Sequence, residues 1–333
     1  MATLKDVASR ANVSISTVSY VLNGKKKVKE KTYNNIMQAV TDIGYVPNQV
    51  ARGLRTKRSL TIGVIVPDIS NEFFPEIFRG IEDVANANDY SIIMCSTDND
   101  VIREKKYIST LISKDIDGII FIGTGKSQDI FDVNIKLPIV LVDRKFGEQF
   151  MSVTIDNYKG GYLATEHLIQ QGYKSIALLA GPLYIKNFFD RMHGYIDALA
   201  DNGINYNDQL VYECKDTSAE GYSVAMKILK KHNIDAIFAS NDLIAFGAIR
   251  AASEMGKKIP IDIGIVGYDD ISLASVIIPS LTTIRQPKYE IGKTSAELVL
   301  EQISNEDIKC RNIEFEPTLV VRETTRNSNL AKV

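Results

Sequence analysis

Beyond residue 60 the chain alternates between short apolar runs and longer segments with helical periodicity. The first run, Thr61–Val66, is continuous, as expected of a strand buried on both faces of a sheet. Further runs of this kind are Ser91–Cys95, Gly118–Ile122, Ile139–Val142, Ile176–Leu179, Ala236–Ala239 and Ile263–Tyr268. Helices are expected between them at Pro75–Asn88, Arg103–Lys114, Lys159–Gln171, Met192–Asn202, Ala219–His232, Leu243–Met255 and Tyr289–Ile303. This rhythm predicts an α/β fold of parallel sheets, in two similar lobes because the units are too many for one sheet.

The first 46 residues carry a different pattern, three short stretches of helical periodicity. The first helix is expected to start at Thr3, with Asp6 completing a capping box. A second short helix spans Ile15–Leu22, and a third spans Glu30–Ile43 and ends at Gly44, a residue suited to a helix C-terminus. Two short helices joined by a tight turn predict a helix-turn-helix.

Charge is divided unevenly between these two regions. Residues 1–60 hold 11 Lys and Arg against 3 Asp and Glu, a net charge of +8, whereas the rest of the chain sums to −10. A basic region with a folded hydrophobic pattern is typical of nucleic-acid binding, because it is attracted to the phosphate backbone. The alternative, a helical module that docks onto another protein, does not account for this charge.

Composition narrows the class of protein further. The chain of 333 residues is 45% hydrophobic and 24% charged, and no stretch approaches the roughly 20 apolar residues needed to cross a bilayer. The N-terminus lacks an apolar signal region, so we expect a cytoplasmic protein without membrane association. Cys95, Cys214 and Cys310 are far apart and match no zinc or disulfide spacing. No nucleophile–base pair or metal-ligand spacing is apparent, and we expect no enzyme activity and no metal.

A nucleotide site is also not expected. Gly123–Ser127 follows a strand and resembles the end of a phosphate-binding loop, but the earlier glycine that such a loop needs is Ile120 here. No GxGxxG sequence occurs. The prediction is therefore that the protein uses no cofactor.

Four ordered motifs identify the chain as similar to the LacI/GalR family of bacterial repressors. They are Leu4–Ala8, Val13–Asn23, Gly44–Asn48 and Val50–Leu54. The resemblance implies a helix-turn-helix DNA-binding domain at 1–46, a hinge helix or linker at 47–59, and an effector-binding and dimerisation core at 60–333. It divides that core into lobe 1 at about 60–157 and 287–317, and lobe 2 at about 158–286 and 318–330.

The resemblance also implies which residues contact a palindromic operator bound by a dimer. Ile15, Ser16 and Tyr20 would face the bases, although many relatives have Arg at the position of Tyr20. The full set implied is Thr3, Ser14, Ile15, Ser16, Thr17, Ser19, Tyr20, Asn23, Lys29, Thr32, Asn48, Val50, Ala51 and Leu54. Leu54 would wedge into the minor groove from a hinge helix that orders on DNA, since Gln49–Lys57 is too short to be stably helical alone.

Polar and aromatic residues gather at the ends of the expected strands of the core. Carboxylates, amides and guanidinium groups beside aromatic rings suit a sugar. The body resembles type I periplasmic sugar-binding proteins, and the set that matches their ribose-type pocket is Asn71, Phe73, Phe74, Asp143, Arg144, Arg191, Asn241, Asp269 and Gln286. An aromatic residue that many relatives carry would fall near Asp216, where this chain has none. Asp242 and Asp270 are interpreted mainly as helix caps or surface ion pairs.

These features predict a transcriptional repressor that binds DNA as a homodimer and responds to a small-molecule effector, most simply a monosaccharide such as ribose. A purine effector remains an alternative. A second alternative is a phosphorylated phosphocarrier protein, because Pro67–Asn71 and Gly80–Asp83 look similar to the carbon catabolite control branch of the family. That branch uses arginines on the helix corresponding to Ser295–Ile303, and here the helix is acidic and without Arg. An enzyme or a plain sugar-binding protein would leave the basic head unexplained.

Overall fold

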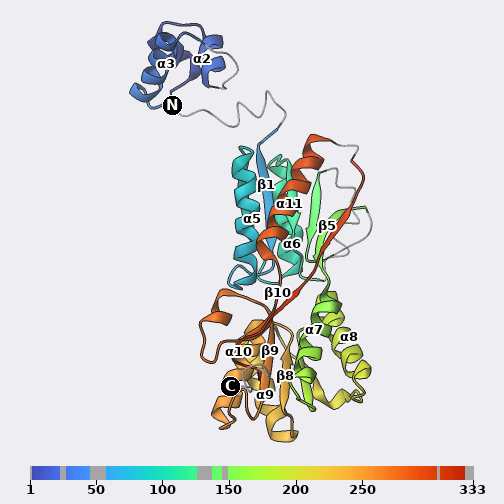
Figure 1. The fold of residues 1–333 in the computed structure, drawn as a ribbon. Helices are drawn as coiled ribbons and strands as arrows, with labels where there is room; N and C mark the ends of the chain where they lie inside the picture. Colours follow the sequence, from blue (N-terminus) through green and yellow to red (C-terminus); the bar gives the residue numbers. More distant parts are fainter. Residues whose placement is uncertain are drawn as a thin grey trace. The chain divides into compact units, whose positions relative to one another are not determined.

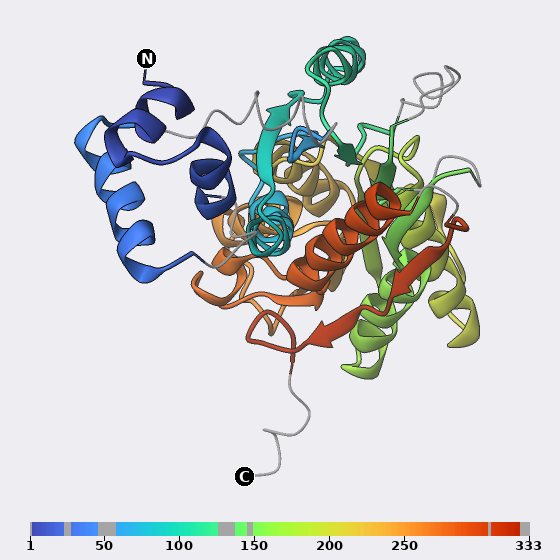
Figure 2. The same ribbon diagram turned by 90° about the horizontal axis from the view of Figure 1, so that it is seen from above.

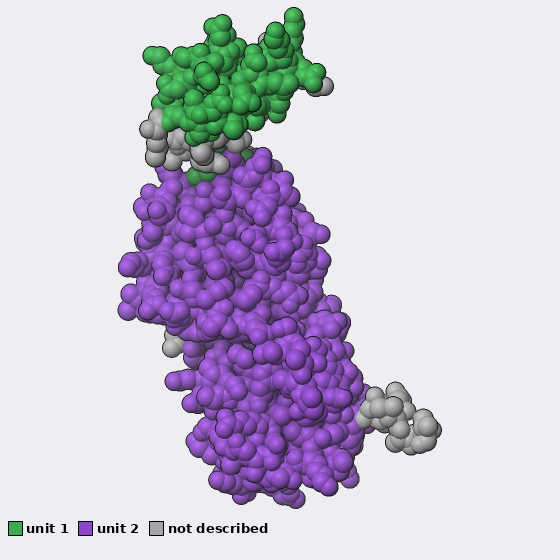
Figure 3. Space-filling view, turned by 90° about the vertical axis from the view of Figure 1, so that its left-hand side faces the viewer, with its two compact units in different colours: residues 1–59 green, residues 60–333 purple. Residues whose placement is uncertain are grey.

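The computed structural model describes residues 2–22, 28–45, 58–125, 137–144, 149–305 and 308–326. It separates into a unit of residues 1–59 and a larger unit of residues 60–333 (Figure 3). In the described part of the chain, no helix is long and apolar enough to cross a membrane.

The first unit is built around helices α1 (Leu4–Ala11), α2 (Ile15–Leu22) and α3 (Glu30–Asp42) (Figure 1). The capping box expected at Thr3 is present: its side chain accepts a hydrogen bond from the Asp6 amide at 3.3 Å, and its own amide donates to the Asp6 carboxylate at 2.8 Å. One apolar residue from each helix is fully buried at the centre of the unit, namely Val7, Val18 and Ile36. The helix-turn-helix prediction is therefore confirmed in its geometry.

Lobe 1 of the larger unit is a parallel sheet in the strand order β11-β5-β4-β3-β1-β2. Its strands are β1 (Thr61–Val66), β2 (Ser91–Ser96), β3 (Gly118–Phe121), β4 (Ile139–Val142), β5 (Met151–Ile155) and β11 (Asn312–Phe315). Helices α5 (Phe73–Ala87) and α11 (Lys288–Ser304) lie side by side on one face, and α6 (Val101–Ser113) covers the other (Figure 2). Glycine permits this close packing of α5 on α11, because a Cβ at Gly292 would lie 1.9 Å from the carbonyl oxygen of Ile77.

Lobe 2 repeats the plan in the strand order β12-β10-β9-β8-β6-β7, with only β12 antiparallel to its neighbour. Its strands are β6 (Ile176–Ala180), β7 (Val211–Glu213), β8 (Ala236–Ala239), β9 (Gly264–Asp269), β10 (Thr282–Arg285) and β12 (Thr318–Val320). Helices α7 (Asn157–Gln170) and α8 (Lys186–Asp201) cover one face, while α9 (Ser218–Lys231) and α10 (Asp242–Glu254) cover the other. Short 3-10 turns, η2 (Asp208–Leu210) and η3 (Ser272–Ser275), complete the lobe.

The chain passes between the lobes three times, after β5, after β10 and between β11 and β12 (Figure 1). Two of these crossings are tied together, because the amide of Asp156 donates to the carbonyl of Phe315 at 3.0 Å. The predicted two-lobed α/β fold is thus confirmed. The prediction was wrong about the start of α8, which begins at Lys186 and not at Met192, and it omitted the strands β5, β7, β11 and β12.

Candidate functional site

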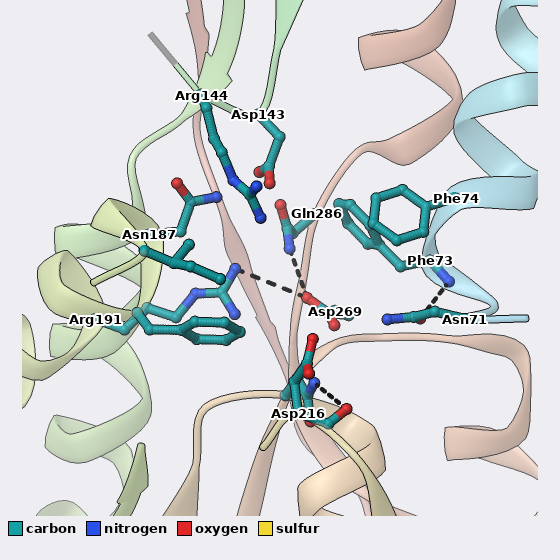
Figure 4. Close-up of a pocket in the computed structure, with 13 residues that line it drawn as sticks. Asn71, Phe73, Phe74, Asp143, Arg144, Asn187, Arg191, Asp216, Asp269 and Gln286 are labelled. Carbon is teal, nitrogen blue, oxygen red and sulfur yellow. Dashed lines mark hydrogen bonds and ion pairs between the residues drawn. The ribbon is translucent and has the colours of Figure 1, made fainter. Parts of the chain in front are cut away.

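A cavity of about 50 Å³ lies between the two lobes, where the carboxyl ends of both sheets face each other (Figure 4). Its lining combines three carboxylates, two guanidinium groups, four amides and four apolar side chains. These residues are Asn71, Phe73, Phe74, Asp143, Arg144, Ile185, Asn187, Phe188, Arg191, Asp216, Asn241, Asp269 and Gln286. All nine residues predicted to bind the effector are among them, so the structure brings together the whole set, and their role in binding stays a prediction.

Lobe 1 supplies two of the three aromatic rings that line the cavity. The side-chain oxygen of Asn71 accepts a hydrogen bond from the amide of Phe73 at 3.0 Å, at the point where α5 begins. Phe73 and Phe74 pack edge to face, with ring centroids 5.2 Å apart and planes at 80°. Such rings offer faces and edges to the C–H surface of a ligand.

Arg191, on α8, is held from several sides. Its Nε donates to the side-chain oxygen of Asn157 at 2.8 Å, and its Nη1 donates to the carbonyl of Ser240. The guanidinium also lies over the ring of Tyr268, 3.5 Å from the centroid. Because Asn157 is the first residue of α7, directly after a crossing between lobes, the position of Arg191 is coupled to the hinge of the larger unit.

Asp269 ends β9 at the centre of the site, with φ at +110°. Its Oδ1 accepts a hydrogen bond from Gln286 Nε2 at 2.6 Å and lies 3.9 Å from Arg191 Nη2. The buried ammonium of Lys288 donates to the carbonyls of Asp269 at 2.8 Å and Asp270 at 2.7 Å, which stabilises this left-handed turn. Burial raises the pKa of Asp269 to about 6, so the carboxylate is ionised at neutral pH.

Two groups in the cavity have polar atoms without a hydrogen-bond partner among the described residues. They are Nε and Nη1 of Arg144 and Oε1 of Gln286, all of them buried. Burial lowers the pKa of the Arg144 guanidinium from its ordinary value, while the carboxylates of Asp143, Glu104 and Asp216 act in the opposite direction. Buried polar atoms of proteins nearly always have partners, so these atoms point to a polar ligand.

The sequence reasoning missed four lining residues, namely Ile185, Asn187, Phe188 and Asp216 as a lining carboxylate. Asn187 and Phe188 precede Arg191 by four and three residues, which places them on its side of a helix. That spacing could have identified them, but α8 was expected to begin after them.

The interpretation of Asp242 as mainly a helix cap or surface ion pair was wrong. The cap of α10 is Asn241, whose side chain accepts from the amide of Ile244 at 2.8 Å. Asp242 is fully buried and accepts from the amide of Ile271 at 2.8 Å and from the hydroxyl of Thr283. Burial raises its pKa well above the ordinary value. Asp270 does form ion pairs as expected, with Arg285 and Arg322 at 2.6 Å each.

In the first unit, α2 presents a mixed surface to solvent. Ile15 and Tyr20 are 49% and 47% exposed, and Ser16 is exposed beside them. The hydroxyl of Ser14 lies 2.8 Å from that of Ser16 and 2.7 Å from that of Thr17, and it accepts from the Thr17 amide, which caps the helix. Exposed short polar side chains at the start of a helix are suited to base edges and phosphates in the major groove.

The remaining residues predicted to contact DNA are distributed around this helix or lie elsewhere. Thr3 and Lys29 are exposed at the starts of α1 and α3, and Ser19 and Thr32 are half-buried. Outside the described residues lie Asn23, Asn48, Val50, Ala51 and Leu54.

Comparison with known proteins extends over nearly the whole chain. Residues 3–48 match the model of bacterial regulatory proteins of the lacI family, and residues 59–323 match that of periplasmic binding proteins and the sugar binding domain of the LacI family. A ribose operon repressor of Halalkalibacterium halodurans is 39% identical over 327 residues, covering 98% of each chain.

Two solved structures are similar to this chain, one over nearly its whole length and one over most of it. The lac repressor dimer bound to operator and the anti-inducer ONPF has a TM-score of 0.87 at 30% identity, covering 97% of this chain and 99% of that one. A LacI family regulator from Enterococcus faecium with bound ribose has a TM-score of 0.73 at 34% identity, covering 80% and 98%. These relatives are transcriptional regulators and not enzymes. The chain therefore belongs to the LacI family of DNA-binding bacterial regulators, with a helix-turn-helix head and a periplasmic-binding-protein-like core.

Proposed function

We propose that this regulator represses transcription by binding a palindromic operator as a homodimer, and that a monosaccharide such as ribose releases or tunes it. The sugar would bind between the lobes of the core. Closure of the lobes around it would then change how the two DNA-binding heads of the dimer are held. Coupling of this kind is typically worth about 1–3 kcal/mol, or a 5- to 150-fold change in operator affinity.

The observation that carries this proposal is the composition of the cavity between the lobes. Hydrogen-bonding groups come from both lobes and lie beside three aromatic rings, which suits the hydroxyls and C–H faces of a sugar (Figure 4). The related regulator from Enterococcus faecium, with ribose bound, supports the same class of ligand.

An exposed apolar surface on lobe 2 supports the homodimer. A second cavity of about 670 Å³ opens there, along the outer face of α10 and the segment that follows η3. Its apolar lining consists of Phe246, Ile249, Ile259, Ile277, Ile278 and Pro279. Ile278 is 93% exposed, and contiguous apolar surface of this kind is typical of a protein–protein interface.

The two alternative effectors would need different groups on the protein. A phosphorylated phosphocarrier protein needs cationic groups on the core, and the stretch 295–303 of α11 contains no Lys or Arg. A purine such as hypoxanthine offers fewer hydrogen-bond donors than a monosaccharide to the three carboxylates that line the cavity. Both alternatives are therefore less well supported than a sugar.

The test starts from duplexes selected by the full-length protein from a random library, since the operator sequence is not known. Fluorescence anisotropy of a selected duplex would then be measured with D-ribose, other pentoses and hexoses, and hypoxanthine. We expect a pentose to change the affinity at least about 5-fold. No change with any sugar, together with a response to hypoxanthine, would contradict the sugar proposal and favour the purine alternative.

A further inference from the structure

The cavity between the lobes has more negative than positive side chains. Three carboxylates line it, from Asp143, Asp216 and Asp269, against the two guanidinium groups of Arg144 and Arg191. Glu104, buried on α6, adds a fourth carboxylate close enough to act on Arg144. Lys288, whose buried ammonium donates to the Asp269 carbonyl, adds a third cation, so four carboxylates still outnumber three cations and an anionic ligand meets excess negative charge.

The two arginines do not offset this excess, because each lies among carboxylates. Arg191 lies 3.9 Å from Asp269, and its Nε and Nη1 donate hydrogen bonds to the Asn157 side chain and the Ser240 carbonyl. Three carboxylates, those of Asp143, Glu104 and Asp216, act on the single charge of Arg144. Of these three, Asp216 is the one that lines the cavity from lobe 2.

Asp216 is held on the lobe 2 side of the cavity. It follows β7 on a half-buried turn, and its backbone carbonyl accepts a hydrogen bond from the side chain of Asn241 at 3.4 Å. Asn241 is itself fixed as the cap of α10. Asp216 thus lies on the lobe 2 wall of the cavity, below Asp269 in the view of Figure 4.

The free polar atoms of the cavity define what the ligand must offer. Nε and Nη1 of Arg144 need acceptors, while Oε1 of Gln286 needs a donor, as do the carboxylates. A hydroxyl donates one hydrogen bond and accepts two, so a polyol satisfies both kinds of group. A phosphate group mainly accepts and brings a charge of about −1.5 to −2 at pH 7.

We propose that the effector is an uncharged, hydroxyl-rich sugar and that Asp216 is the residue that excludes phosphorylated sugars from this pocket. This inference rests on the monosaccharide effector proposed above, and it specifies that this effector carries no charge. Asp216 accepts hydroxyl hydrogen bonds from the neutral sugar and repels a phosphate, so one side chain contributes to both binding and rejection.

The experiment compares D-ribose with D-ribose 5-phosphate, which differ by one phosphate group. Both would be titrated calorimetrically into the full-length protein, its Asp216→Asn variant and an Asp208→Asn control. Asp208 is an exposed carboxylate of the same lobe, in η2, outside the cavity. Asp216→Ser serves as a second variant should Asn perturb folding, which circular dichroism would monitor.

We expect the unmodified protein to bind ribose at least about 100-fold more tightly than ribose 5-phosphate. Asp216→Asn should reduce this ratio at least about 10-fold, mainly through tighter binding of ribose 5-phosphate, and Asp208→Asn should leave the ratio unchanged.

Equal affinities of the unmodified protein for both ligands would overturn the inference. An unchanged ratio in both Asp216 variants would overturn it too, and both outcomes would leave the monosaccharide proposal intact. If neither ligand bound the unmodified protein, the ribose-type effector itself would be refuted, and this inference with it.

Discussion

Replacing Asp269 with Asn should strengthen the fold at high pH and weaken the response to the effector. The carboxylate is buried, and burial raises its pKa from the ordinary value of 3.8 to about 6. The unfolded chain therefore releases this proton near pH 4, whereas the folded chain holds it to near pH 6. Ionised Asp269 lowers the free energy of unfolding above pH 6, by roughly 3 kcal/mol for a shift of about two pKa units.

Asparagine keeps the shape of Asp269 and an acceptor for Gln286, but it has no charge to bury. We expect Asp269→Asn to raise the free energy of unfolding at pH 8 by up to about 3 kcal/mol, with the gain shrinking as the pH falls below 6. The same change replaces a charged acceptor for sugar hydroxyls with a neutral one. Each such hydrogen bond is worth about 1.5–3 kcal/mol, so effector affinity should fall about 10- to 150-fold.

Urea denaturation of the free protein at pH 5 and pH 8 measures the first effect, and effector titration measures the second. The operator affinity of the effector-free protein should be unchanged, since Asp269 lies in the larger unit and the DNA-contacting residues are expected in the first unit. A variant less stable than the unmodified protein at pH 8 would refute the reasoning. Such a result would mean that Arg191 and Lys288 compensate the buried charge fully.

Three further changes test other parts of the molecule. Leu54→Ala should weaken specific operator binding more than non-specific binding, because a side chain inserted in the minor groove stabilises the complex only on a bent operator. Equal losses of both affinities, in anisotropy titrations at fixed salt, would contradict the assignment of residues 47–59 as a hinge helix. Ile278→Asp should convert the homodimer to a monomer in sedimentation velocity, because it places a charge in the apolar surface of lobe 2, and an unchanged dimer would remove this surface from the interface. Lys288→Met should lower the free energy of unfolding by about 2 kcal/mol, because the carbonyls of Asp269 and Asp270 lose their shared donor, and urea denaturation showing no loss would contradict this role.

Much of the architecture could be predicted from local patterns. The continuous apolar run of β1, the capping pair of Thr3 and Asp6, and Gly44 at φ +60° after α3 are each set by neighbouring residues, so periodicity and helix-end chemistry suffice. Most of the nine predicted pocket residues follow strands, and parallel strands place their carboxyl ends at one edge, so polar residues gather there. The resemblance to ribose-type pockets completed the set, including Arg191 on α8.

Other features depended on segments far apart in the sequence. Strands β11 and β12 are short and pair only because the chain returns to each lobe, and their partners β5 and β10 lie far away in the sequence. The burial of Asp242 could not be read locally, since its hydrogen bonds go to Ile271 and Thr283 and not to its own helix.

The sequence by itself determined the order of helices and strands, the division of charge between head and core, and which residue types follow each strand. Only the tertiary structure decided that Asp216 and Phe188 share a cavity with Asp269, and that burial there raises the pKa of Asp269. The physical reason is range: periodicity and capping act within a few residues, whereas desolvation and electrostatic fields depend on which distant segments enclose a group.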